Sequence, residues 1–239
     1  MRIVTFSFDD GFRRSFQRTA EIFEARGLSC SLNVMADESA DLTSMDKSLA
    51  GLGDFGLWNE LAARGHEIMP HSLRHENLAK LDFEDGKGRI LRCLDVFEEK
   101  LAGFRRADAI FHYPFNASTP ALDAWLSTVI RAYRNGYEGF QPLPTRATVR
   151  ITATSHGPEN CEPHLEDCIE KLLAMPEGWL FYNTPGIDGE GWGPIGGDYL
   201  SRLLDRLLAM KEMKVLTPAQ ALDTATRGLQ AHPVNRIAK

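Results

Sequence analysis

The chain has 239 residues, of which 43% are hydrophobic and 25% charged, an ordinary composition for a globular protein whose core needs no disulfide bonds. Its formal net charge is −6 and its pI is near 5.7, which argues against a nucleic-acid-binding surface because such a surface needs clustered Lys and Arg. An uncharged or cationic substrate fits this chain more easily than a polyanion.

The cysteines and the first residues bear on location. The four cysteines form no Cys-x-x-Cys pair, and their sparse placement is typical of reduced thiols (Cys30, Cys93, Cys161 and Cys168). The sequence begins in an apolar strand, without a cationic leader and cleavage site, and no run approaches the roughly 18 apolar residues that span a bilayer. We therefore expect a cytoplasmic protein with no membrane span.

Strand and helix patterns alternate from end to end. Short β-prone runs predict strands at 2–7, 29–34, 67–70, 109–113, 129–134, 148–154, 179–183 and 214–216. Amphipathic spacing and capping residues predict helices at 12–26, 54–64, 88–103, 163–175 and 199–211. Two further helices are predicted to begin at residues 118 and 217. Asp54 is the expected N-cap of the second helix, and Ser118-Thr119-Pro120 is the expected start of the fourth.

This alternation predicts parallel βαβ units in an α/β fold. Seven or eight such units in about 230 residues favour a (β/α) barrel over an open sheet. No repeat or change of composition marks a second domain, so we expect one barrel domain over residues 1–228, followed by a polar tail at 229–239.

Two motifs follow predicted strand ends, where α/β barrels carry their chemistry. Asp9 and Asp10 follow the first strand, and His71 follows the third, with His75 four residues later. One carboxylate and two imidazoles can hold a metal ion and leave positions open, while the neighbouring carboxylate accepts a proton from metal-bound water. The alternatives are a simple turn at Asp9-Asp10-Gly11 and two solvent-facing histidines.

The motifs together resemble those of the NodB-type polysaccharide deacetylases, carbohydrate esterase family 4. Residues 7–11, Ser-Phe-Asp-Asp-Gly, are similar to the Thr-Phe-Asp-Asp-Gly signature of that family. Residues 71–75 resemble its His-Ser/Thr-x-x-His motif, and residues 111–116 its Phe-Arg-Pro-Pro-Tyr-Gly motif. Residues 186–194, Gly-Ile-Asp-Gly-Glu-Gly-Trp-Gly-Pro, are similar to a stretch found in one branch of the superfamily.

The resemblance implies an irregular (β/α)7-type barrel and a hydrolase acting on C–N bonds other than peptide bonds. It implies that Asp10, His71 and His75 hold a divalent ion, most often zinc, with cobalt as an alternative. It further implies that Asp9 is the general base and that the backbone N–H of Phe115 helps to hold the oxyanion. The expected reaction removes an acetyl-like group from an amide nitrogen of an amino sugar.

Two positions depart from the family pattern. His112 stands where the third motif of the family has an Arg. We expect His112 either to act at the site, by pairing with Asp9 or contacting substrate, or to be a buried structural residue. Pro185 stands where the family has its general-acid His. The candidate substitutes each have a structural alternative as well (Tyr182, Asp188, Glu190 and His156).

Aromatic side chains near the motifs can stack on sugar rings. The candidates are Trp58, Tyr113, Phe115 and Trp192. We expect Tyr113 and Trp192 to contact substrate together with Asp188 of the Gly-rich loop, although Trp192 also fits a lid or core role.

We therefore predict a metal-dependent hydrolase acting on a small-molecule or oligosaccharide substrate, such as an acetylated or formylated amino sugar or a glycoconjugate. One alternative is hydrolysis of a cyclic ureide or imide, with a lining built around Arg74, Tyr113 and Arg150. Another is a catalytically impaired sugar-binding protein. Iron oxygenase chemistry at the two histidines and one carboxylate is a third.

Overall fold

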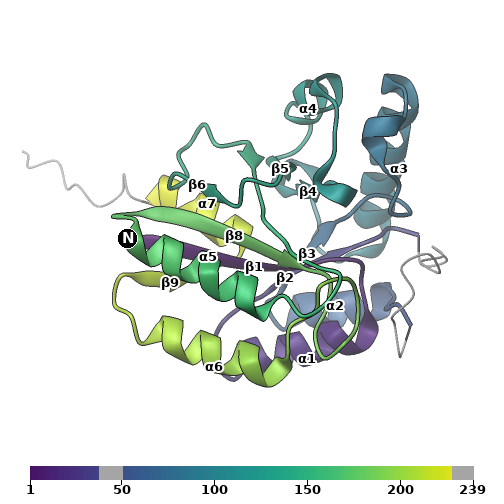
Figure 1. The fold of residues 1–239 in the computed structure, drawn as a ribbon. Helices are drawn as coiled ribbons and strands as arrows, with labels where there is room; N and C mark the ends of the chain where they lie inside the picture. Colours follow the sequence, from purple (N-terminus) through teal and green to yellow (C-terminus); the bar gives the residue numbers. More distant parts are fainter. Residues whose placement is uncertain (38–50, 228–239) are drawn as a thin grey trace, which may run out of the picture.

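The computed structural model describes residues 1–37 and 51–227, and its helices surround a set of mainly parallel strands (Figure 1). The strands are β1 (Arg2–Phe8), β2 (Ser31–Val34), β3 (Glu67–Pro70), β4 (Ile110–His112), β5 (Ala132–Arg134), β6 (Phe140–Gln141), β7 (Arg150–Ile151), β8 (Gly178–Thr184) and β9 (Met213–Val215). The α-helices are α1 (Arg13–Glu24), α2 (Phe55–Ala63), α3 (Phe83–Lys100), α4 (Pro120–Leu126), α5 (Glu162–Ala174), α6 (Gly197–Leu208) and α7 (Pro218–Arg227). The expected tail at 229–239 lies outside the described residues.

The strands form a distorted barrel from two sheets. A six-stranded sheet has the order β3-β2-β1-β8-β6 with β9 also on β1, and a three-stranded sheet has the order β4-β5-β7. A parallel bridge between Thr154 and Tyr182 joins the end of the second sheet to β8. At the other junction, the N–H of Ile110 donates to the Met69 sulfur at 3.4 Å, so a side chain links β3 to β4. The predicted irregular (β/α) barrel is confirmed.

Most element boundaries follow the local signals in the sequence. Asp54 caps α2 as expected, by accepting a hydrogen bond from the backbone N–H of Leu57. Helix α4 starts in the expected segment, where Thr119 accepts a hydrogen bond from the backbone N–H of Leu122. Helix α3 begins earlier than its apolar spacing predicts, because Asp82 caps it at residue 83. The two-residue strand β6 was not expected, and the predicted strand at 148–154 is reduced to β7.

The two faces of β1 explain where the site forms. Phe6 and Phe8 face outward and meet the Phe23 ring of α1 edge-on, with centroids 6.4 and 6.2 Å away. On the other face, the Thr5 hydroxyl accepts a hydrogen bond from the Trp179 indole at 2.9 Å inside the barrel. Successive inward residues therefore run from apolar to polar along β1, and polar side chains collect at its carboxyl end.

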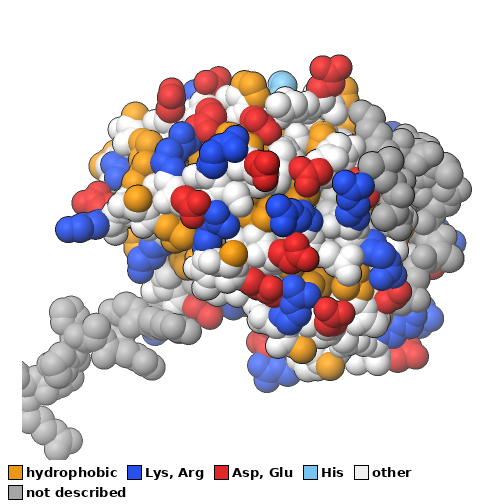
Figure 2. All heavy atoms as spheres, turned by 90° about the horizontal axis from the view of Figure 1, so that it is seen from below, with side chains coloured by type: hydrophobic (Ala, Val, Ile, Leu, Met, Phe, Trp, Pro, Cys, Tyr) orange, Lys and Arg blue, Asp and Glu red, His pale blue; other side chains and the backbone are white. Residues whose placement is uncertain are grey.

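The outer surface carries charges of both signs. On the face seen from below, basic and acidic side chains are interspersed without a large region of one sign (Figure 2). One pair, Arg26 on the loop after α1 with Asp205 on α6, uses two N–H···O bonds of 2.7 and 2.8 Å. In the two described ranges, every helix is too short or too polar to cross a membrane.

Glu67 lies at the start of β3, where its carboxylate accepts a hydrogen bond from the backbone N–H of Ala219 in the first turn of α7. Burial raises the pKa of Glu67 to about 7, although hydrogen bonds from Thr217 and Ala219 act in the opposite direction. The folded protein therefore favours the protonated carboxyl more than the unfolded chain does, whose Glu pKa is about 4.3.

This shift predicts a pH-dependent effect of Glu67→Gln. The stability linked to Glu67 is complete below about pH 4 and is lost as the pH rises through about 7, because the folded state must then bury a charge. Glu67→Gln should raise the free energy of unfolding by about 1–3 kcal/mol at about pH 8 and leave it nearly unchanged at about pH 4. Urea unfolding at both pH values measures this. Exposed Glu84 provides the control as Glu84→Gln, and equal effects at both pH values would contradict the prediction.

Candidate active site

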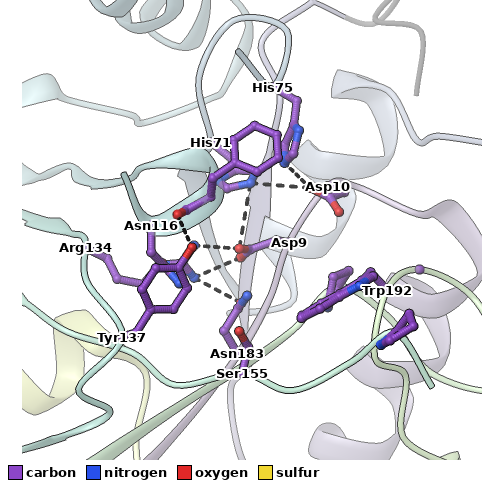
Figure 3. Close-up of a pocket in the computed structure, with 14 residues that line it drawn as sticks. Asp9, Asp10, His71, His75, Asn116, Arg134, Tyr137, Ser155, Asn183 and Trp192 are labelled. Carbon is purple, nitrogen blue, oxygen red and sulfur yellow. Dashed lines mark hydrogen bonds and ion pairs between the residues drawn. The ribbon is translucent and has the colours of Figure 1, made fainter. Parts of the chain in front are cut away.

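The site forms where β1 and β3 end. Asp10, Ser72 and His75 have positive φ values of 75°, 67° and 61°, which residues with a side chain rarely adopt. Such conformations persist where the surrounding structure enforces them, commonly at functional sites. The reversal at Asp10 turns its side chain toward the histidines, while Asp9 points to the barrel axis (Figure 3).

Asp10, His71 and His75 form a potential metal site. One ligand atom from each residue lies within 4.8 Å of the others. The Oδ1 atom of Asp10 is 3.4 Å from Nε2 of His71 and 3.3 Å from Nε2 of His75. Both carboxylate oxygens of Asp10 are buried and have no hydrogen-bond partner in the structure. A buried carboxylate without a partner is costly, so these residues fit a bound cation.

The histidines are oriented for ligation. His71 Nδ1 lies 2.8 Å from the backbone carbonyl of His112, which leaves Nε2 facing Asp10. The backbone N–H of His75 donates to the Ser72 hydroxyl at 2.9 Å. Burial lowers the pKa of His75, although the Asp10 charge opposes this, so its imidazole is neutral near pH 7. Neutral imidazoles bind metals, and the contact of Nδ1 with the His112 carbonyl fixes the ring of His71 for that role.

Asp9 is paired with Arg134, a residue that the sequence analysis did not select. Arg134 ends β5 and donates from Nη2 to Oδ2 of Asp9 at 2.6 Å and from Nη1 to Oδ1 at 3.2 Å. Both side chains are buried, with exposed fractions of 1% and 5%. Burial alone would raise the pKa of Asp9, but the Arg134 and His71 charges outweigh it and hold that pKa well below its usual range. Asp9 is therefore ionised near neutral pH.

Two amides and a hydroxyl complete the surroundings of Asp9. Asn33 on β2 donates to Oδ1 of Asp9 at 2.7 Å, and Ser7 lies 3.3 Å from the same oxygen. Asn183 at the end of β8 accepts a hydrogen bond from Arg134 at 3.0 Å. Four strands therefore hold this carboxylate in one orientation.

His112 does not take the role of the family arginine. Its imidazole is fully buried, and neither ring nitrogen has a hydrogen-bond partner in the structure. Burial, together with the Arg134 charge, lowers the pKa of His112 well below its ordinary value. The ring is thus a neutral interior group, and only the backbone carbonyl of His112 serves the site. Arg134 could have been found as a charged residue ending a predicted strand at the same level as Asp9.

A cavity of about 480 Å³ opens beside Asp9, Asp10, His71 and His75. Three exposed aromatic residues line it, Phe115 (49% exposed), Tyr137 (62%) and Trp192 (43%). Tyr137 and Trp192 lie on opposite sides of Asp9 (Figure 3). The Phe115 ring lies 4.7 Å from the His75 ring, between centroids. Trp192 rests on Gly157, where an added Cβ would come within 2.6 Å of the indole.

Other residues expected at the site lie elsewhere. Tyr113 is fully buried and packs against Phe111 and Tyr133, so its ring faces the core and does not line the cavity. Asp188 is exposed and accepts a hydrogen bond from Gly197 N–H at the start of α6. Trp58 is buried against Phe16.

The proposed substitutes for the general acid are also engaged away from the cavity. The Tyr182 hydroxyl contacts His164 Nδ1 at 3.0 Å. Glu190 is buried and accepts hydrogen bonds from the N–H and hydroxyl of Ser15. His156 stacks on His164 with centroids 4.8 Å apart. Pro185 itself lines the cavity.

No protein-family profile matches the sequence, and no curated protein matches it. Solved structures do match. A candidate polysaccharide deacetylase from Mycobacterium smegmatis shares 16% identity with a TM-score of 0.69, over 97% of this chain and 92% of that one. The chain has the polysaccharide deacetylase fold. The resemblance inferred from the motifs is thereby confirmed at the level of the fold.

Two further matches illustrate the range of this fold. The peptidoglycan deacetylase PdaC from Bacillus subtilis shares 12% identity with a TM-score of 0.57, over 96% of this chain and 94% of that one. The allantoinase Puue shares 13% identity with a TM-score of 0.65, over 97% and 91% of the two chains. The polysaccharide deacetylase fold thus occurs in proteins named for different reactions.

The Asp9–Arg134 pair predicts a large effect of Arg134→Met. Removing the guanidinium leaves a buried carboxylate without its charge partner, which should lower the free energy of unfolding by about 3–5 kcal/mol. Urea unfolding with a chelator present measures it. Adding Asp9→Asn should recover part of the loss, because both charges are then gone. Arg18→Met, at an exposed position, is the control. A similarly small loss of unfolding free energy in both variants would contradict the prediction.

Proposed function

We propose that this protein is a metal-dependent hydrolase that removes a small acyl group from an amide nitrogen of an amino sugar or glycoconjugate. The grouping of Asp10, His71 and His75, with both Asp10 oxygens unpartnered, carries the proposal. The ionised Asp9 beside it and the polysaccharide deacetylase fold support it.

In this proposal, Asp10, His71 and His75 would hold the divalent ion, with zinc as the first choice for two imidazoles and a carboxylate. Such an ion lowers the pKa of bound water and polarises a carbonyl. Asp9 accepts the proton of the attacking water, and Arg134 keeps Asp9 ionised and oriented. The backbone N–H of Phe115, in a residue with φ of 56°, would donate to the oxyanion.

The cavity supports a small, uncharged substrate. Its volume of about 480 Å³ lies in the range typical of small-molecule sites. Exposed Phe115, Tyr137 and Trp192 offer faces for a sugar ring. Asn116 lines the cavity, and its buried Oδ1 has no partner in the structure, so it can accept a hydrogen bond from a substrate hydroxyl or N–H.

Hydrolysis of a cyclic ureide is the second candidate, favoured by the similarity in fold to an allantoinase. The lining expected for it does not assemble at the cavity. Arg74 pairs with Asp37, Arg150 donates to Asn135, and Tyr113 is buried. We therefore place the amino-sugar substrate first.

The metal site predicts the effect of Asp10→Ala and His75→Ala. Each should abolish binding of one zinc ion per chain, because two remaining ligands hold an ion poorly. The wild type should gain about 2.7 kcal/mol of stability at zinc concentrations 100 times the Kd, and the variants should gain none. Elemental analysis and thermal unfolding with and without zinc measure this. Asp205→Ala, at an exposed position on α6, should behave as wild type. Zinc binding by Asp10→Ala would contradict the site.

The role of Asp9 predicts that Asp9→Asn binds zinc normally but loses turnover. The amide can still accept from Arg134 but cannot take a proton, so kcat should fall by about 10²–10⁴-fold. Acetate release from N-acetylglucosamine and its oligomers measures the rate. Unchanged turnover would reject Asp9 as the base. Failure of the wild type on every acylated amino sugar would reject the proposed function.

A further inference from the structure

Cleavage of an amide requires a proton on the departing nitrogen, because an amide anion is a far poorer leaving group than an alkoxide. General acids of this kind contribute about 10²–10⁴-fold to the rate. Pro185 stands at the position expected for that acid and has no proton to give. Tyr182, Glu190, His156 and Asp188 are all held by contacts away from the cavity.

One side chain with a hydroxyl group in the cavity wall is left as a candidate for this step. Of the ionisable residues lining the cavity in the described ranges, Asp10, His71 and His75 form the metal site, and Asp9 and Arg134 pair with each other. The remaining one is Tyr137, whose phenol is among the side chains able to act as general acids.

The position of Tyr137 brings its hydroxyl to the reacting region. Its loop follows β5, and Gly136 and Gly139 flank it with φ values of 79° and 62°. Its hydroxyl donates a hydrogen bond to the backbone carbonyl of Phe115, the residue whose N–H is proposed above to donate to the oxyanion. In Figure 3 the phenol points from the Arg134 side toward Asp9 and His71. The ring is exposed, so its oxygen is also in reach of solvent protons.

We propose that, given the hydrolase function proposed above, Tyr137 donates the proton to the leaving nitrogen and thereby replaces the acid lost at Pro185. Water adds its oxygen to the acyl carbon and gives a proton to Asp9. As the C–N bond breaks, its electron pair stays on nitrogen, which takes the Tyr137 proton. The proton on Asp9 returns through solvent to the phenolate. The balance is amide plus water to carboxylic acid plus amine, with no other reactant.

The variant Tyr137→Phe tests this through the leaving group. It should lower kcat for N-acetylglucosamine by about 10²–10⁴-fold with little change in KM. It should lower kcat for 4-nitrophenyl acetate less than about fivefold, because nitrophenolate leaves without a proton and the rest of the machinery is intact. Tyr199→Phe is the matched control, since that phenol donates to Glu166 on the outer surface.

Rescue provides a second arm. Pro185→His in the Tyr137→Phe background places an imidazole in the cavity wall. The double variant should hydrolyse the amide at least tenfold faster than Tyr137→Phe alone. Equal losses with amide and ester, or a rise in KM alone, would overturn the proposal and make Tyr137 a binding residue. Full amide turnover by Tyr137→Phe with none by Asp9→Asn would reject Tyr137 while the hydrolase function stands. No turnover of either substrate by the wild type would reject both.

A structure gives a readout that does not depend on rate. In crystals of Asp9→Asn with zinc and N-acetylglucosamine, the Tyr137 hydroxyl should lie about 2.6–3.2 Å from the amide nitrogen, or reach it through one water. A hydroxyl still bonded to the Phe115 carbonyl, with the amide nitrogen out of reach, would overturn the proposal.

Discussion

Two adjacent carboxylates are buried at the carboxyl end of β1, and the barrel mouth is built around the need to match their charges. Asp9 is matched from within by Arg134, which reaches across the barrel axis from β5. The carboxylate oxygens of Asp10 have no hydrogen-bond partner in the structure, and the two imidazoles beside it could hold a cation together with it. The positive φ of Asp10 turns its side chain toward the histidines, whereas Asp9 faces Arg134, and both carboxylates line the cavity. This geometry underlies the proposed division of labour, in which Asp10 would bind the metal ion and Asp9 would accept a proton.

The charge partner of Asp9 shows how one function can be supplied from a different strand. At the position of the family arginine the chain has His112, whose ring is neutral and unpartnered inside the barrel. The backbone carbonyl at that position still anchors His71, because this contact does not depend on the side chain. The positive charge comes instead from Arg134. The site requires a positive charge in contact with Asp9. That charge can be supplied from a different strand.

The cavity wall near Pro185 includes Trp192, which packs on Gly157. The Gly-rich loop that carries Trp192 is held by structural contacts: Glu190 binds the start of α1, and Asp188 binds the start of α6. In the described part of the chain, the ionisable residue of the cavity wall that belongs neither to the metal site nor to the Asp9–Arg134 pair is Tyr137, in the loop after β5. In the proposed reaction, the acyl group of the substrate would lie toward Asp10 and its leaving group toward Tyr137.

The sequence by itself determined the alternation of strands and helices and the cap at Asp54, since these depend on spacing and neighbours. The meeting of Asp10 with His71 and His75 was predicted from their places at strand ends and from the family resemblance. The sequence also indicated the fold, because the motifs fall at strand ends. Only the tertiary structure decided that Arg134 is the partner of Asp9, that Tyr113 faces the core, and that Glu190 and Asp188 are structural. These outcomes depend on which strands become neighbours in the closed barrel and on the rotation of each side chain, and neither is encoded in local spacing.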